Sequence, residues 1–204
     1  MKLILVRHGE TYWNKERRVQ GGRSDVELNS LGREQAARLA SFLRDEDLDA
    51  VVSSPLKRAK LTAEIIASQH ELPIEVNEEL KEIDVGDFEG VSLSTLPNTF
   101  SQLLMEWWRG GEDRLPGGES FVELQRRCWG VVESLLGRGS KEVIVIVSHY
   151  FVVLAIILKA LDLPLGYLAK FKIDPAGLSI LEFESYGARL VTLNDTSYLK
   201  FLSS

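Results

Sequence analysis

The chain has 204 residues, of which 45% are hydrophobic and 26% charged, and its formal net charge is −6. These values are ordinary for a globular protein, and the length suits one α/β domain with a modest insertion. Because the chain is acidic and has no basic run, we expect no nucleic-acid partner. An anionic substrate would have to be attracted by a local cluster of cations.

The cysteine content and the apolar runs bear on the cellular compartment. Cys128 is the one cysteine, so no disulfide can form within the chain, which fits a reducing compartment. Arg7 cuts short the apolar run at the amino terminus, unlike in a signal peptide. No apolar stretch reaches the length that spans a bilayer. We therefore predict a cytoplasmic protein with no membrane partner.

The first predicted element is a strand that is buried on both faces. Residues 3–6 form a short apolar run, and Arg7, His8 and Gly9 follow it directly. These polar residues would lie just past the carboxyl end of the strand, where open α/β sheets bind ligands. Residues 12–29 are polar and aperiodic, and predict a long loop over that site.

Two amphipathic helices are predicted next, and a strand follows each of them along the chain. Apolar residues recur at helical spacing over residues 30–44 and 58–70. Short apolar runs at residues 50–52 and 74–76 predict the strands. Residues 84–118 follow, and they are too few and too rich in glycine to form their own core. We predict that they cap the site as an insertion within a single domain spanning residues 1–204.

The second half of the chain begins with a helix in that cap, predicted over residues 99–109. Another helix opens at Ser120 with a capping box and ends near Gly137. Residues 143–147 predict a second buried strand, which ends in Ser148 and His149. A helix over residues 151–161 follows this strand.

The tail alternates between apolar and polar residues from Leu178 to Leu193, which predicts an antiparallel hairpin at the edge of the sheet. We therefore predict a three-layer α/β fold, with a mostly parallel central sheet flanked by helices. An edge strand can pair with another subunit, so a homodimer is kept as an alternative to a monomer.

Parallel neighbouring strands would deliver five polar side chains to one edge of the sheet: Arg7, His8, Arg58, Glu82 and His149. Arginine binds phosphate oxygens bidentately and stays charged, so the paired arginines indicate a phosphoryl group. An arginine beside His8 works against a bound cation, so we expect no metal. The chain also lacks the phosphate-binding loop of nucleoside-triphosphate kinases, and no cofactor is expected.

These side chains suggest a double displacement. A neutral imidazole is a good nucleophile toward phosphorus, and the arginines would disfavour the charged form of His8. Glu82 could give the proton that the leaving alkoxide needs, and could later deprotonate water.

Five blocks of the sequence resemble those of the histidine phosphatase superfamily, also called phosphoglycerate mutase-like, and in particular its phosphatase branch. The blocks span nearly the whole chain, and their joint occurrence makes the resemblance specific. They are Leu5 to Thr11 with Trp13 and Asn14, Ser53 to Ala59 with Thr62 and Ala63, Leu80 to Gly90, Pro116 to Ser120, and Val147 to His149.

The resemblance implies a role for each residue of the predicted site. His8 would be the phosphorylated nucleophile and Glu82 the proton donor. The phosphoryl oxygens would be held by Arg7, Arg58 and His149. The family's fold, a mostly parallel sheet flanked by helices, agrees with the fold predicted above.

The resemblance also implies that Asn14, Gln20 and Gly21 contribute to the substrate pocket. One position departs from the family pattern, because most relatives have glycine after the second histidine and this chain has Tyr150. The tyrosine hydroxyl could bond the substrate, or the ring could narrow the pocket. This departure affects the identity of the substrate more than the chemistry.

The leading hypothesis is a metal-independent phosphomonoester hydrolase that acts through phosphohistidine on a small phosphorylated metabolite. One alternative is a phosphoglycerate mutase, which returns the phosphoryl group to its substrate. Mutases of the family generally carry a longer insertion around the glutamate block, so the modest insertion favours the phosphatase. A non-catalytic phosphate-binding module is the other alternative.

Overall fold

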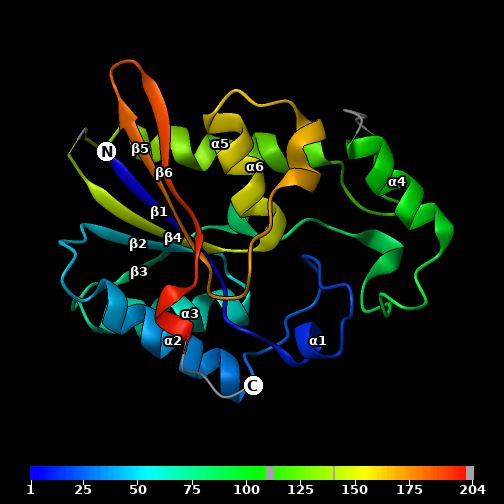
Figure 1. The fold of residues 1–204 in the computed structure, drawn as a ribbon, viewed down its shortest axis with the longest axis horizontal. Helices are drawn as coiled ribbons and strands as arrows, with labels where there is room; N and C mark the ends of the chain where they lie inside the picture. The colour runs from blue at the N-terminus through cyan, green and yellow to red at the C-terminus, as the bar shows by residue number, and fades with distance from the viewer. Residues whose placement is uncertain (109–112, 140, 201–204) are drawn as a thin grey trace.

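A six-stranded mixed sheet forms the centre of the computed structural model, which describes residues 1–108, 113–139 and 141–200 (Figure 1). The strand order is β3-β2-β4-β1-β5-β6. Neighbouring strands are parallel from β3 to β1, and β5 and β6 each run antiparallel to the preceding strand. The strands are β1 (Lys2–Arg7), β2 (Ala50–Ser53), β3 (Ile74–Val76), β4 (Val143–Ser148), β5 (Leu178–Glu184) and β6 (Gly187–Asp195). The predicted sheet and its antiparallel edge hairpin are confirmed.

Helices cover both faces of this sheet, as predicted (Figure 1). Alternate residues of β1 belong to two different core clusters: Leu3 and Leu5 to one, Ile4 and Val6 to the other, and all four are fully buried. Strand side chains alternate between faces, which explains why the run in β1 is continuously apolar. The first cluster includes residues of α5 (Phe121–Leu136) and α6 (Tyr150–Ala160), and the second includes residues of α2 (Ser30–Leu43) and α3 (Lys57–Ser68).

The predicted cap contains the 3-10 helix η2 (Gly86–Phe88) and the helix α4 (Asn98–Trp108). The helix predicted at residues 99–109 is thus present, although Arg109 lies outside the described residues. In Figure 1, α4 stands out to one side of the sheet, and it contacts η3 (Leu165–Lys170), the short helix after α6. The single-domain organisation stays a prediction.

The prediction of an uninterrupted loop over residues 12–29 is wrong at its start, where α1 (Tyr12–Lys15) forms one helical turn. The Thr11 hydroxyl accepts a hydrogen bond from the Asn14 backbone N–H at 3.1 Å. The Asn14 side-chain oxygen accepts one from the Thr11 backbone N–H at 3.0 Å. This capping box stabilises a turn that is too short for apolar periodicity to indicate.

The remaining 3-10 helices are η1 (Glu78–Leu80) and η4 (Ser197–Leu199). Cys128 is fully buried in α5, and burial raises the pKa of its thiol to about 12, so it behaves as a small apolar residue. No helix in the described ranges has the length and apolar composition that a membrane crossing requires. β6 lies at the edge of the sheet, and the homodimer stays a prediction.

Candidate active site

The two histidines of the site are brought together by the pairing of β1 with β4. The strands are parallel, and their register sets Arg7 opposite Ser148. His8 and His149 therefore leave the carboxyl ends of the strands side by side, with ring centroids 5.2 Å apart. The backbone N–H of His8 donates to the Ser148 carbonyl at 2.9 Å, which extends the pairing into the site.

The His8 ring has a defined tautomer. Its Nδ1 lies 2.7 Å from the carbonyl oxygen of Gly9. Because a carbonyl can only accept, Nδ1 carries the hydrogen and Nε2 keeps its lone pair. Burial lowers the pKa of His8 well below its ordinary value, and the positive charges of Arg58 and Arg7 lower it further. His8 is therefore a neutral imidazole near pH 7, with a free Nε2.

The two arginines of the site are oriented by backbone carbonyls. Arg7 Nη1 donates to the Ile173 carbonyl at 2.6 Å. Arg58, which is fully buried, donates from Nη1 to the Ser24 carbonyl at 2.7 Å and from Nη2 to the Gly21 carbonyl at 3.0 Å. Burial lowers the pKa of Arg58 to about 10, so it remains a cation at neutral pH.

His149 is held by a hydroxyl group and keeps a free donor. The Leu56 backbone N–H donates to Ser54 Oγ at 3.3 Å, and Ser54 Oγ lies 2.8 Å from His149 Nε2. A Ser54 hydroxyl that donates to Nε2 leaves the hydrogen of His149 on Nδ1, which has no hydrogen-bond partner among the described residues. Burial, followed by the charge of Arg58, lowers the pKa of His149 well below its ordinary value.

Several buried donors of this site have no hydrogen-bond partner among the described residues. They include Arg7 Nε, Arg58 Nε and His149 Nδ1. Buried polar atoms in native proteins almost always have partners. Two unpaired arginine donors beside an unpaired imidazole nitrogen therefore point to a ligand with several acceptor oxygens, such as a phosphoryl group.

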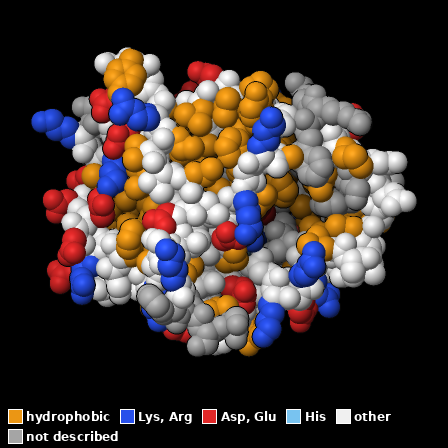
Figure 2. All heavy atoms as spheres, in the orientation of Figure 1, with side chains coloured by type: hydrophobic (Ala, Val, Ile, Leu, Met, Phe, Trp, Pro, Cys, Tyr) orange, Lys and Arg blue, Asp and Glu red, His pale blue; other side chains and the backbone are white. Residues whose placement is uncertain are grey.

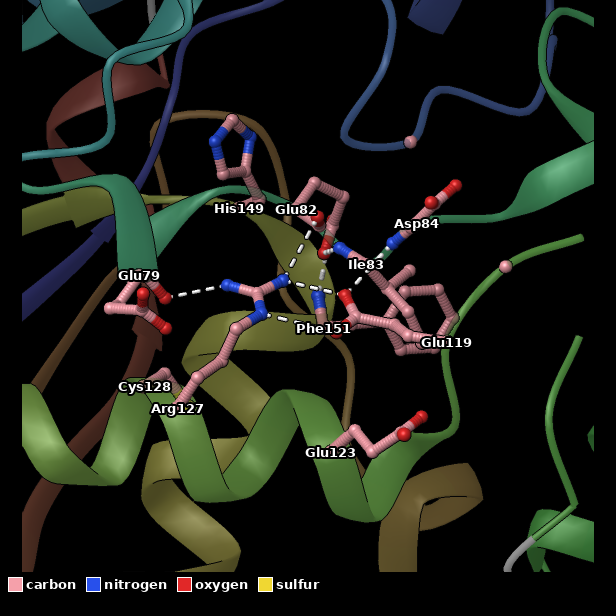
Figure 3. Close-up of polar contacts among 12 residues, drawn as sticks. Glu79, Glu82, Ile83, Asp84, Glu119, Glu123, Arg127, Cys128, His149 and Phe151 are labelled. Atoms are coloured by element: carbon pink, nitrogen blue, oxygen red, sulfur yellow. Dashed lines mark hydrogen bonds and ion pairs between the residues drawn. The ribbon is translucent and has the colours of Figure 1, made fainter.

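The Glu82 carboxyl lies in the same site and is only 5% exposed (Figure 3). Its Oε1 accepts a hydrogen bond from the Ile83 N–H at 2.8 Å, and its Oε2 accepts one from the Phe151 N–H at 3.3 Å. Burial has the largest effect on this group and raises its pKa. Glu82 thus holds a proton at a higher pH than an exposed glutamate does.

A cavity of about 790 Å³ opens beside these groups and is lined by Arg7, His8 and Glu82. Of the residues expected in the substrate pocket, Asn14, Gln20 and Tyr150 also line it. Gly21 is not among the lining residues, since its carbonyl faces Arg58. A Cβ atom at Gly21 would lie 2.5 Å from a methyl carbon of Val85, so glycine is needed there for close packing.

Tyr150 is the first residue of α6, and the Arg7 guanidinium carbon lies over its ring, 5.3 Å from the ring centroid. Its hydroxyl donates to the Phe171 carbonyl at 3.3 Å. The side chain thus links the start of α6 to the segment after η3. Stacking on an aromatic face and the hydrogen bond to Ile173 together restrict the orientation of Arg7.

The wall of the cavity that follows η3 is not indicated by the sequence. This wall contributes Phe171, Lys172, Asp174 and Pro175. The segment carries no motif or periodicity that would indicate a binding wall. It reaches the site through hydrogen bonds with β1 and its end, including Ala176 N–H to the His8 carbonyl at 3.0 Å.

The donor chemistry of the site does not match that of a metal centre. No group of three or more His, Cys, Asp or Glu side chains in the described ranges is arranged to hold a metal ion. His8 and His149 instead lie beside two arginines, whose charges oppose a bound cation.

Comparison with known proteins identifies one family over almost the whole chain. The sequence model of the histidine phosphatase superfamily (branch 1) matches residues 3–196. The chain is 35% identical over 200 residues to the bifunctional protein Rv2228c of Mycobacterium tuberculosis, and the match covers 97% of this chain. It covers 55% of that relative, so the chain spans about half the relative's length.

Other curated relatives match over most of their own length. Phosphoserine phosphatase 1 of Hydrogenobacter thermophilus is 33% identical, with 98% of this chain and 94% of the relative covered. The probable phosphoglycerate mutase GpmB of Salmonella choleraesuis is 32% identical, with 98% and 95% covered.

Solved structures give the same result. A phosphoserine phosphatase variant from Entamoeba histolytica in complex with phosphoserine has a TM-score of 0.86 at 30% identity, covering 97% of this chain and 98% of the other. A mycobacterial glucosyl-3-phosphoglycerate phosphatase in complex with VO3 has a TM-score of 0.85 at 28% identity, covering 96% and 99%.

The buried histidines make stability sensitive to acid. The native state keeps His8 neutral, whereas the unfolded chain protonates it as the pH falls through about 6.5. The unfolded state then binds more protons, so the free energy of unfolding decreases with falling pH. When the pH falls from about 7.5 to about 5.5, the free energy of unfolding should decrease in both proteins. We expect the decrease to be about 1.4 kcal/mol smaller in His8→Gln than in the wild type.

Urea unfolding at the two pH values measures this difference. Equal losses in the wild type and in His8→Gln would show that His8 titrates normally in the native state.

Proposed function

The chain belongs to the histidine phosphatase superfamily, and on that premise we propose that it is a phosphomonoester hydrolase that acts through a phosphohistidine on His8. The observation that carries the proposal is the neutral His8 ring, whose free Nε2 lies among buried donors that lack partners. We propose a small phosphorylated metabolite as the substrate. No step of the proposed chemistry needs a metal ion.

In the first step, His8 Nε2 attacks the phosphorus atom, and the bond from phosphorus to the ester oxygen breaks. The non-bridging oxygens accept hydrogen bonds from Arg7, Arg58 and His149. These positive and polar groups stabilise the charge that spreads over the oxygens in the transition state. They are oriented beforehand by backbone carbonyls and by Ser54, so little reorganisation is needed during the reaction.

Glu82 is the proposed acid and base. Its raised pKa keeps a proton available for the ester oxygen as that oxygen leaves. The resulting carboxylate then takes a proton from water, and the water oxygen attacks the phosphorus of the phosphohistidine. The bond from phosphorus to Nε2 breaks, phosphate is released, and His8 and Glu82 return to their starting states.

The remainder of the cavity indicates what kind of alcohol leaves. Its lining beyond the phosphoryl site includes many apolar side chains, among them Val85, Leu93, Leu104, Phe151, Leu168 and Phe171. Figure 2 shows hydrophobic side chains gathered over α6 and η3 and again over α4, the elements that border this cavity. A substrate with an apolar body beside its phosphate would bury that body here.

A phosphoglycerate mutase is the second candidate, and the 32% identity to the probable mutase GpmB favours it. A mutase would pass the phosphoryl group from His8 to a bound alcohol in place of water. It would interconvert 2- and 3-phosphoglycerate faster than it releases phosphate, and it would depend on a bisphosphate primer.

His8→Ala should abolish phosphate release from p-nitrophenyl phosphate, a loss of at least about 10³-fold, because the attacking atom is removed. The wild type should remain active in excess chelator. His70→Ala is the matched control, since His70 does not line the cavity, and it should retain full activity. Turnover that survives in His8→Ala, or that the chelator abolishes, would contradict the proposal.

Glu82→Gln should slow hydrolysis of benzyl phosphate by about 10²-fold or more while slowing that of p-nitrophenyl phosphate much less. Benzyl alkoxide needs a proton to leave, whereas p-nitrophenolate does not. The comparison of kcat/KM values for the two esters measures the difference, because kcat/KM reports the step in which the ester oxygen leaves and not the later attack of water, which both esters share. Equal losses on both would remove Glu82 from the role of acid.

Benzyl phosphate should be hydrolysed with a kcat/KM about 10-fold or more above that of phosphoserine, because the apolar wall can bury a phenyl ring. Both esters release an alkoxide, so leaving-group reactivity does not favour one of them strongly. A preference for phosphoserine would show that the apolar wall does not contact the substrate.

A further inference from the structure

Glu82 lies in a stretch of chain that regular secondary structure does not hold. Residues 81–85 fall between η1 and η2 and belong to no helix or strand. One carboxylate hydrogen bond of Glu82 is to its own neighbour Ile83, and the other, to Phe151, is long at 3.3 Å. The place of this carboxyl in the site therefore depends on what fixes the surrounding backbone.

Arg127, on α5, reaches this backbone from below (Figure 3). Its Nη1 donates to the Glu79 carbonyl at 2.5 Å, and its Nη2 donates to the Glu82 carbonyl at 3.1 Å. One guanidinium thus holds two carbonyls, one just before the irregular stretch and one on Glu82 itself.

Glu119 completes the arrangement on the other side of Glu82 (Figure 3). Its carboxylate accepts from Arg127 Nη2 at 2.7 Å and from Arg127 Nε at 3.1 Å. The same carboxylate accepts from the Asp84 backbone N–H at 2.9 Å, and the Glu119 N–H donates to the Asp84 carbonyl at 2.9 Å. The chain is therefore fixed at Glu79, Glu82 and Asp84 by one ion pair.

This ion pair is largely shielded from solvent, with side-chain exposures of 19% for Arg127 and 16% for Glu119. Burial alone would lower the pKa of Arg127, but its hydrogen bonds and charge interaction with Glu119 outweigh that effect and raise it. A planar guanidinium bound bidentately to a carboxylate has a fixed geometry, which a lysine cannot reproduce.

Resting on the proposed role of Glu82 as the proton donor, we propose that Arg127, oriented by Glu119, is a positioning residue for the Glu82 carboxyl. Arg127 and Glu119 contact this stretch at backbone atoms of Glu82 and Asp84, so both act on the carboxyl through the backbone. A carboxyl displaced by about 1 Å can lose about 10²-fold in rate, because proton transfer requires hydrogen-bond distance.

The test compares two phosphate esters in Arg127→Met, which keeps the length and apolar stem of the side chain and removes its donors. We expect kcat/KM for benzyl phosphate to fall by about 10- to 100-fold, and kcat/KM for p-nitrophenyl phosphate to fall by less than about 3-fold. The high-pH limb of the kcat/KM profile for benzyl phosphate, which reports the proton on Glu82, should also shift. A structural role alone would lower both rates together and leave the profile in place.

Arg138→Met is the matched control. Arg138 lies just after α5 and pairs bidentately with Glu75 at 2.8 and 2.7 Å, but this pair is far more exposed. Its removal should leave the ratio of the two kcat/KM values, benzyl phosphate over p-nitrophenyl phosphate, unchanged. If Arg127→Met does not fold, Glu119→Gln and Arg127→Lys take its place. Each should lower the ratio of kcat/KM for benzyl phosphate to kcat/KM for p-nitrophenyl phosphate.

The outcomes separate this inference from the proposed function. If Glu82→Gln shows the leaving-group effect and the Arg127 and Glu119 variants do not, the positioning role is overturned and the proposed function stands. If Glu82→Gln lowers both rates equally, the acid role itself fails. The positioning role is supported if the ratio of kcat/KM for benzyl phosphate to kcat/KM for p-nitrophenyl phosphate falls in Arg127→Met and is partly restored in Arg127→Lys.

Discussion

β1 and β4 pair in parallel in the one register that sets Arg7 opposite Ser148, and the rest of the site depends on that pairing. Slipping one strand by a residue would turn every side chain to the other face of the sheet. His8 would then no longer stand beside His149, and Leu3 to Val6 would face the wrong core clusters. The two cores on either side of the sheet thus also specify the geometry of the two histidines.

The site concentrates positive charge on buried side chains. Two arginines and two histidines would repel one another if all were ionised, and burial of the imidazoles resolves this by keeping both neutral. Arg58 remains charged because burial lowers its pKa only to about 10. Backbone carbonyls of Gly21, Ser24 and Ile173 accept the hydrogen bonds of the two arginines. The remaining donors lack partners, so a bound phosphoryl group would complete the hydrogen bonding that the protein leaves unfinished.

Much of the site could be predicted from the sequence because its residues follow directly on apolar runs. A continuous apolar run such as that of β1 indicates a buried strand from neighbouring residues alone. The polar residues that follow it must lie at the carboxyl end of that strand. The family resemblance added Glu82, which charge alone did not distinguish from its acidic neighbours. It also implied a substrate contact for Gly21, which stays a prediction, and the structure shows that the Gly21 carbonyl accepts a hydrogen bond from Arg58.

The parts that could not be predicted depend on contacts between distant segments. The wall from Phe171 to Pro175 is held beside the cavity by the Arg7 side chain, which donates to the Ile173 carbonyl, and by the Tyr150 hydroxyl, which donates to the Phe171 carbonyl. No local pattern in the sequence indicates these contacts. The hydrogen bond from Arg127 to the Glu82 carbonyl likewise joins two segments that are far apart in the sequence. The α1 turn was missed for a different reason, since a capping box at Thr11 was present in the sequence but supports a single turn.

A phosphoryl group on His8 is tested most directly by rapid quenching of the enzyme with a phosphate ester, followed by mass spectrometry of the peptide that contains His8. We expect this peptide to gain one phosphoryl group that is labile in acid and stable in alkali, as a phosphorus–nitrogen bond is. With p-nitrophenyl phosphate, whose leaving group needs no proton, the Glu82→Gln variant should accumulate more of it, because water then attacks the intermediate slowly. Turnover without any phosphorylated peptide, or with the group on another residue, would contradict covalent catalysis by His8.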